Sequence, residues 1–184
     1  KYVHTDKAPE YKLAFDELDY AVDTATPHRP ETNGVAERAV CRVKEGTSCA
    51  MIQSGWDYIW WDLGQDAFCF WRNVVDEQRN GNTSCFARFG ENFSGPIIPF
   101  GAEVSWKPIA QKDIDRLHKF GSKMLSGTFL GYEQQAGGGW SGNLLLPDWD
   151  DIENVDAACD TYPKTLNAKE VNPIKLNDQF GFPL

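Results

Sequence analysis

The sequence pattern changes near residue 96, and this change limits the possible folds more than any other feature. Before it, apolar residues recur at helical spacing over 35–54 and 56–75. After it, short β-type runs such as "PIIPFGAEVSWKPI" and "WSGNLLLPDW" alternate with Gly and Pro. Such punctuation is typical of a small barrel or sandwich. We therefore predict an α/β part over residues 1–95 and a small β-barrel over 96–155.

Two short strands are expected near the N-terminus. "KYVHTD" is typical of a strand that ends at Asp6, and "AVDTAT" of a second strand. Between them, residues 11–20 carry apolar side chains at a spacing that fits a helix or a strand, and we favour the helix. "PHRPETNG" is expected to be a loop, because its two prolines and its Asn-Gly pair interrupt regular structure.

Two helices should follow this loop. The first is predicted over 35–54, with Asn33 or Thr32 as its N-cap and Gly46 as a weak point in its middle. The second is predicted over 56–75, where "WDYIWWDLGQDAFCFWRNVV" has apolar residues almost all round. A helix with that pattern is expected to be largely buried.

The formal net charge is −9, with 18 basic and 27 acidic side chains. This argues against a purely electrostatic nucleic-acid binder, which is normally basic. Of the three segments 1–95, 96–147 and 148–184, only 96–147 has no excess of acidic residues, with 5 basic and 4 acidic side chains. The last segment, 156–184, is acidic and shows little periodicity, so we predict an extended or docked tail.

Membrane insertion and zinc binding are not expected. No run of about 18 apolar residues is present, so nothing in the sequence predicts a membrane span. The five Cys residues include no CxxC pair, their number is odd, and their spacing fits no zinc motif. Free, buried thiols are typical of a reducing compartment, and we therefore expect an intracellular protein.

Two motifs in the first half carry a resemblance to a known family. "HTDKAPEY" followed by "TPHRPETNGVAER" resembles the second half of the integrase catalytic core of Ty1/Copia-type retrotransposons. The family pattern there runs P-H-T-P-Q-Q-N-G-V-A-E-R, and residues 27–38 match it at nine of twelve positions. The resemblance implies a ribonuclease-H-like core, of which residues 1–95 would be the C-terminal part.

The resemblance continues to about residue 150. "SCFARFGENFSGP" resembles a segment that follows the core in this family, and "RLHKFGSKMLSGTFLGYE" resembles part of the SH3-like barrel beyond it. The resemblance therefore implies that the predicted β-barrel at 96–155 is SH3-like. By contrast, "GYEQQAGGGWSG" lacks the Lys-Ser/Thr of a phosphate loop, and we expect a β-turn there.

The family implies DNA integration by metal-dependent 3′-end processing and strand transfer. In the family an Asp, Asp, Glu triad binds two Mg²⁺ or Mn²⁺ ions, which hard carboxylate ligands favour. By the resemblance Asp6 is the second Asp and Glu37 the Glu, both catalytic and metal-binding. The first Asp would lie upstream of Lys1. The implied partners are element and target DNA, a homo-oligomer or an upstream polyprotein segment, and the implied location of an active integrase is the nucleus.

Other interpretations of these residues remain open. Lys7, Ala8 and Pro9 replace the Asn-Gly-Gly that usually follows the second Asp. An Asp at a strand end is often a turn or cap residue, and the helix dipole favours a Glu in a first turn. With one metal ligand missing, this chain should be inactive alone. The alternative is a non-catalytic, domesticated descendant that binds nucleic acid or serves as a structural interaction module.

Two groups of basic residues could contact nucleic acid. Lys44 lies seven positions after Glu37, hence on the same helix face, and Arg38 and Arg42 lie on a neighbouring stripe. The second group lies in "KPIAQKDIDRLHKFGSK", where we predict that Lys112, Lys119 and Lys123 contact the nucleic-acid backbone. For both groups the alternative is a solvated surface.

Overall fold

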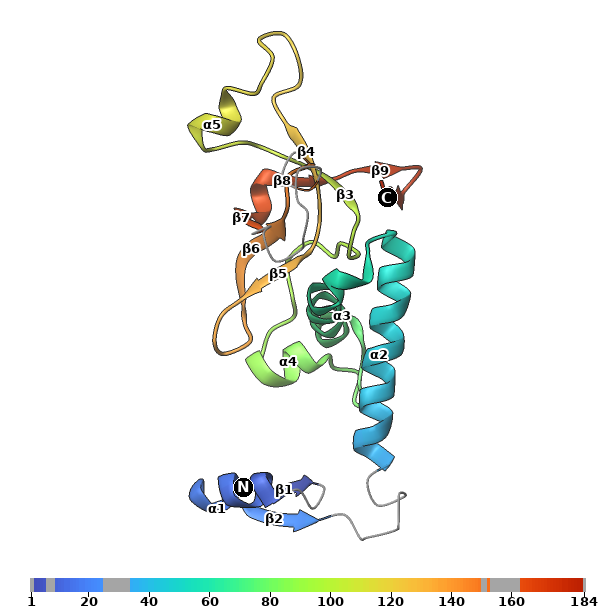
Figure 1. Ribbon diagram of the computed structural model, residues 1–184, viewed down its shortest axis with the longest axis vertical. Helices are drawn as coiled ribbons and strands as arrows, with labels where there is room; N and C mark the ends of the chain where they lie inside the picture. The colour runs from blue at the N-terminus through green and yellow to red at the C-terminus, as the bar shows by residue number, and fades with distance from the viewer. Residues whose placement is uncertain (1, 6–8, 25–33, 150–151, 153–162, 184) are drawn as a thin grey trace. The chain divides into compact units, whose positions relative to one another are not determined.

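The computed structural model describes residues 2–5, 9–24, 34–149, 152 and 163–183 (Figure 1). The chain forms two compact units, Lys1–Lys44 and Glu45–Leu184, which are described separately. Asp6 and most of the loop before Glu37 lie outside the described residues, so the predictions made for them stay untested.

The first unit contains a parallel strand pair. β1 (Tyr2–Thr5) pairs with β2 (Ala21–Thr24), and α1 (Pro9–Glu17) lies between them in the chain. Two parallel neighbours need a crossover connection, which α1 supplies. The predicted strand, helix, strand order is therefore confirmed. The ribonuclease-H-like core itself stays a prediction, because these few elements do not define it.

Helix α2 (Gly34–Ser54) matches the predicted helix, and its interior glycine has a packing role. A Cβ atom on Gly46 would lie 1.9 Å from the Phe68 ring of α3. Only glycine therefore permits this close approach. The C-terminal half of α2 buries Thr47, Met51 and Ser54.

The predicted helix over 56–75 is divided, and it is less buried than its composition indicates. A 3₁₀ turn, η2 (Tyr58–Trp60), is capped by the Asp57 carboxylate and leads into α3 (Trp61–Val75). In α3 only Gly64, Ala67 and Phe70 are buried, whereas the exposed fraction of Trp61 is 56%. The prediction of a largely buried helix is therefore wrong for the part of the chain that the structure describes. The buried residues lie three apart on one stripe, which faces α2 and β5.

The second unit contains two antiparallel three-stranded sheets, in the orders β4-β3-β8 and β5-β6-β7. Their bounds are β3 Glu103–Trp106, β4 Leu125–Thr128, β5 Gly131–Gln134, β6 Trp140–Leu146, β7 Lys164–Asn167 and β8 Val171–Pro173. Only buried Phe129 and Leu130 separate β4 from β5, so one run of chain enters both sheets. Among the described strands no pairing closes a barrel, and the SH3-like barrel stays a prediction.

Strands from the predicted acidic tail belong to both sheets. β7 pairs with β6, β8 pairs with β3, and the 3₁₀ turn η4 (Ala168–Glu170) connects β7 to β8. A short hairpin of β9 (Lys175–Leu176) and β10 (Gln179–Phe180) follows. The sheets thus join segments from both sides of the predicted boundary at residue 155.

Aromatic rings around Tyr132 form the centre of the larger hydrophobic core. Tyr132 stacks on Phe70 of α3 with ring centroids 4.3 Å apart. Its hydroxyl donates to the Pro96 carbonyl at 2.9 Å and accepts from the Ile98 amide at 3.1 Å. Burial raises the pKa of Tyr132 to about 12. This side chain therefore joins α3, the segment before β3, and β5.

The second unit contains two further short helices, α4 (Ser84–Phe89) and α5 (Gln111–Ile114). The glycine-rich stretch forms the predicted turn, between β5 and β6. Cys41 and Cys49 are exposed, contrary to the expectation of buried thiols. No helix among the described residues has the length and apolar character to cross a membrane.

Candidate nucleic-acid interface

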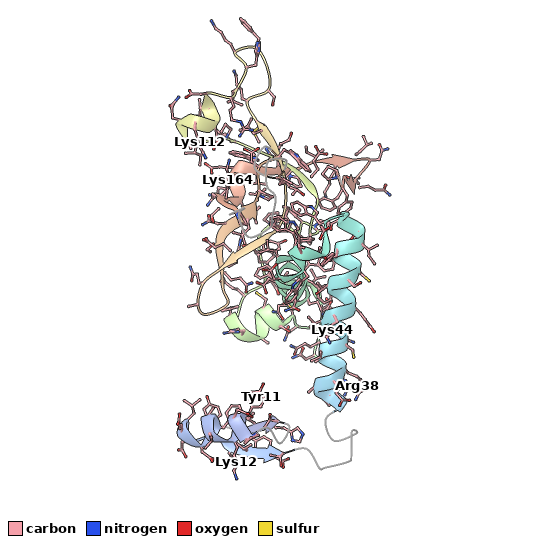
Figure 2. The ribbon with its side chains drawn as sticks, in the orientation of Figure 1. Tyr11, Lys12, Arg38, Lys44, Lys112 and Lys164 are labelled. Carbon is pink, nitrogen blue, oxygen red and sulfur yellow. The ribbon has the colours of Figure 1, made fainter. Side chains whose placement is uncertain are left out.

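The chain between β3 and β4 forms an exposed loop that carries all of the second predicted basic group. We call residues 107–124 the basic loop. It contains α5 and begins directly after the buried Trp106 at the end of β3. Its lysines, all exposed, are Lys107, Lys112, Lys119 and Lys123. Figure 2 shows Lys112 on α5 and Lys164 on β7.

A cluster of ion pairs attaches the basic loop to the sheets. Arg116 of the loop forms a two-point ion pair with Asp148, whose side chain is only 1% exposed. The Lys164 ammonium lies 3.0 Å from Asp148 and 3.4 Å from Asp113 of α5. Asp148 follows β6 and Lys164 begins β7, so the cluster connects three distant segments. We call these four residues the anchor.

The electrostatics of the anchor favour an ionised Asp148. Burial alone would raise the pKa of Asp148, but the hydrogen bonds from Arg116 and Lys164 outweigh it, and the pKa lies below its usual value. The Lys164 ammonium also lies 4.9 Å from the centroid of the Trp106 ring. Because Arg116 is engaged in the anchor, this basic residue of the loop serves to position the others.

Two of the predicted contact residues have different surroundings. The Lys123 ammonium donates to the carbonyl oxygens of His118 and Lys119, at 3.3 and 3.0 Å, and so closes the tip of the loop. The Lys119 ammonium lies 5.7 Å from the ring centroid of Phe120, which is 86% exposed. The loop therefore presents cations beside an exposed aromatic face.

Lys112 is the member of the predicted group that lies on α5. Its side chain is exposed on α5, and among the described residues its ammonium makes no hydrogen bond or ion pair. A lysine in this state can bind a phosphate oxygen without losing a protein partner. The structure places Lys112, Lys119 and Lys123 on one loop.

The first predicted basic group lies on the first turns of α2. Glu37, Arg38, Arg42 and Lys44 are all exposed there. The Arg38 Nε donates to the Gly34 carbonyl within the same helix at 3.0 Å. These residues belong to the first unit and the basic loop belongs to the second.

The predicted metal site is only partly described. Glu37 lies in the first turn of α2, and Asp6 lies outside the described residues, directly after β1 in sequence. Within the described residues no group of three or more His, Cys, Asp or Glu side chains is placed to hold a metal ion. Glu37 alone does not make a two-metal site.

Sequence reasoning missed two features of this interface. The anchor depends on contacts between Asp113, Asp148 and Lys164, up to 51 positions apart, and no local pattern marks them. Phe120 could have been recognised, since an aromatic residue among cations in "RLHKFGSK" is a composition that single-stranded nucleic-acid binders use.

Comparison with known proteins gives only distant structural similarity. No family model and no curated protein matches the chain. Among solved structures, one chain in the cryo-EM structure of the simian T-cell lymphotropic virus intasome in complex with PP2A regulatory subunit B56 gamma matches with a TM-score of 0.41 and 14% identity. The match covers 96% of this chain and 59% of that chain. The chain is thus weakly similar to a chain of a viral intasome assembly, and this similarity alone assigns it neither a fold nor an activity.

Proposed function

We propose that the chain is part of a DNA integrase of the Ty1/Copia type. The observation that carries the proposal is the stretch "PHRPETNGVAER", residues 27–38, with its match to the family pattern. The order of β1, α1, β2 and α2 is compatible with it, because the two strands are parallel and Glu37 lies in the first turn of the helix that follows them.

In this proposal Asp6 and Glu37 contribute two carboxylates to a site for Mg²⁺ or Mn²⁺. Such ions activate the attacking oxygen and stabilise the leaving oxygen of the phosphodiester. Glu37 is suited to hold a cation because its carboxylate is exposed.

The cationic side chains would position the DNA. Lys44 shares a helix face with Glu37, and Arg38 and Arg42 lie on the adjacent stripe, so all three can contact phosphates near the scissile bond. The basic loop would contact the phosphate backbone at a second place through Lys112 and Lys119. Local cations of this kind let a chain with a net charge of −9 bind DNA.

The experiment is a nicking and strand-transfer assay in Mn²⁺ with an oligonucleotide that has a free 3′ hydroxyl. We expect metal-dependent products from the chain supplied with the third carboxylate in a longer protein, and at least a 100-fold loss in Glu37→Gln. Glu45→Gln, an exposed carboxylate further along α2, is the matched control and should retain activity. Equal product from wild type and Glu37→Gln would remove Glu37 from the mechanism.

The second candidate function is a non-catalytic nucleic-acid-binding module. The observation that favours it is the altered sequence after Asp6, where Lys7, Ala8 and Pro9 change both charge and backbone beside a predicted ligand. This candidate predicts salt-dependent DNA binding through the basic loop without metal, and no nicking under any metal condition. Absence of DNA binding at low salt would reject both candidates.

A further inference from the structure

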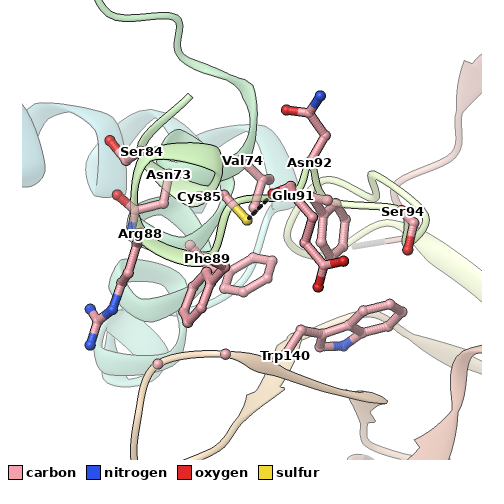
Figure 3. Close-up of a pocket in the computed structure, with 14 residues that line it drawn as sticks. Asn73, Val74, Ser84, Cys85, Arg88, Phe89, Glu91, Asn92, Ser94 and Trp140 are labelled. Atoms are coloured by element: carbon pink, nitrogen blue, oxygen red, sulfur yellow. Dashed lines mark hydrogen bonds between the residues drawn. The ribbon is translucent and has the colours of Figure 1, made fainter. Parts of the chain in front are cut away.

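A pocket of about 360 Å³ lies in the second unit, away from the basic loop in sequence. Its walls come from α3, α4, the segment after α4 and the turn between β5 and β6 (Figure 3). Thr83 caps α4, and Gly90 ends it with a φ of 78°, which lets the chain reverse. The reversal brings residues 91–94 to the pocket opposite α4.

The pocket has aromatic walls whose orientation is fixed. Phe93 and Trp140 lie with ring centroids 5.0 Å apart. Trp140 Nε1 donates to the Asn143 carbonyl at 2.7 Å, which satisfies the indole and leaves its partly exposed ring for contact. Phe89, on the last turn of α4, is 45% exposed and also lines the pocket. Flat rings of this kind suit a flat ligand.

Two opposite charges line the same pocket without pairing. The Arg88 guanidinium lies 5.5 Å from the centroid of the Phe89 ring. The Glu91 carboxylate points toward the Trp140 ring (Figure 3). Among the described residues neither charged group makes a hydrogen bond or an ion pair. A ligand that carries donors at one end and an anion at the other would satisfy both groups.

We infer that this pocket binds an unstacked guanine nucleotide. A carboxylate only accepts hydrogen bonds, and guanine offers two adjacent donors, N1–H and N2–H, to one acceptor. The aromatic walls would stack the base, and Arg88 would bind the nucleotide phosphate. Adenine presents an acceptor at N1, which the Glu91 carboxylate repels. The pocket therefore prefers guanine to adenine.

The inference deepens the proposed function and rests on it for the source of the nucleotide, an unpaired guanine in single-stranded DNA. Asn73 and Asn92 also line the pocket, and their amides can bind the sugar or the base edge. Binding of the free nucleotide does not depend on integrase chemistry, so the two proposals can fail separately.

The first test is a titration of the full chain with GMP and AMP, followed by calorimetry. We expect GMP to bind at least about 10-fold more tightly than AMP, because one well-placed pair of hydrogen bonds gives discrimination of this size. In Glu91→Gln the preference should fall to about 2-fold or less. Glu77→Gln, an exposed carboxylate outside the pocket, is the control and should keep the full preference.

A second variant tests the location without touching the charged groups. A Cβ atom on Gly139 would lie 3.7 Å from the Phe89 ring, an ordinary contact distance, so Gly139→Leu can fill the pocket with little strain on the fold. We expect a thermal midpoint close to wild type and at least a 10-fold loss of GMP affinity. Unchanged GMP binding in Gly139→Leu, or equal binding of GMP and AMP to wild type, would overturn the inference.

A third measurement separates this inference from the proposed function. An oligonucleotide with a single-stranded guanine overhang should bind more tightly than the same duplex with an adenine overhang, and Arg88→Gln should weaken the former while Arg79→Gln should not. GMP selectivity without any Glu37-dependent nicking would support the pocket and count against the integrase. Glu37-dependent nicking without GMP selectivity would do the reverse.

Discussion

The basic loop and the first turns of α2 both present exposed cations, but the protein holds them differently. The loop is attached by the anchor, in which Asp148 is buried and paired with Arg116 and Lys164. The first turns of α2 are exposed, and the described contact of Arg38 there lies within its own helix. The geometry of the loop therefore depends on tertiary structure, whereas that of the α2 group follows from helix periodicity.

The largest effect should come from breaking the anchor. Asp148→Asn keeps the size of the side chain but removes the carboxylate that Arg116 and Lys164 share, while the Asp113 carboxylate stays beside them. Since the remaining charges are only partly exposed, we expect a loss of about 3 kcal/mol in the free energy of unfolding. Urea denaturation followed by Trp fluorescence measures it. Asp115→Asn, an exposed carboxylate of the same loop, should change stability by less than about 0.5 kcal/mol.

The next effect tests which group of cations binds DNA. One variant replaces Lys112, Lys119 and Lys123 with Gln, and the other replaces Arg38, Arg42 and Lys44. The slope of log affinity against log salt is negative, and each lost phosphate contact should reduce its magnitude by about 0.9. Each triple variant should therefore reduce the magnitude of the slope by about 2 to 3. Binding to a duplex at several salt concentrations gives the slope. If the α2 variant keeps the wild-type slope, its cations are a solvated surface.

A smaller effect concerns the aromatic residue at the tip of the loop. Phe120→Ala should weaken single-stranded DNA binding about 10-fold, since a stacked base contributes roughly 1–3 kcal/mol. Stability should stay within about 0.5 kcal/mol because the side chain is 86% exposed. Fluorescence anisotropy with a labelled oligonucleotide measures the binding. Tyr58→Ala, another exposed aromatic residue, is the control, and an equal loss in both variants would argue against stacking at Phe120.

The last prediction concerns acid, which should remove the contribution of the Asp148 carboxylate without a substitution. The pKa of Asp148 in the folded protein lies below its usual value, so its contribution to stability is complete above about pH 4, the range of an unfolded Asp. That contribution is lost as pH falls through the folded pKa. The difference in unfolding free energy between wild type and Asp148→Asn should therefore be constant from pH 7 to about 5 and shrink below pH 4. A constant difference down to pH 2 would contradict this assignment.

Local patterns predicted the first half of the chain well. α2 was found from its helical spacing, and the parallel strands from short apolar runs on either side of α1. The burial of α3 was overestimated. The number of apolar residues in a helix does not show how many of its faces pack against other helices or strands. Trp61 and Trp71 lie off the stripe that contacts α2 and β5, and they remain exposed.

Long-range pairing was beyond sequence reasoning. β8 spans only Val171–Pro173, too short for a periodic signal, and its position beside β3 depends on a partner 67 residues earlier. The anchor could not be predicted either, because no local sequence pattern shows that an Asp and a Lys in separate segments form an ion pair. The cations of the basic loop were predicted as a group, but their different structural roles were not. Arg116 attaches the loop, Lys123 closes its tip, and Lys112 is exposed to solvent.

The position of Lys164 late in the sequence affects the order in which parts of the protein can fold during synthesis. Asp113 leaves the ribosome 51 residues before Lys164, and Ser105 of β3 precedes its β8 partner Asn172 by 67. Until those later segments emerge, β3 has an unpaired edge and the loop has an incomplete attachment. A nascent chain arrested before Lys164 should therefore be cut by protease within 107–124 faster than one extended past Pro173. The proposed nucleic-acid-binding surface would then become competent only when translation of this region is complete.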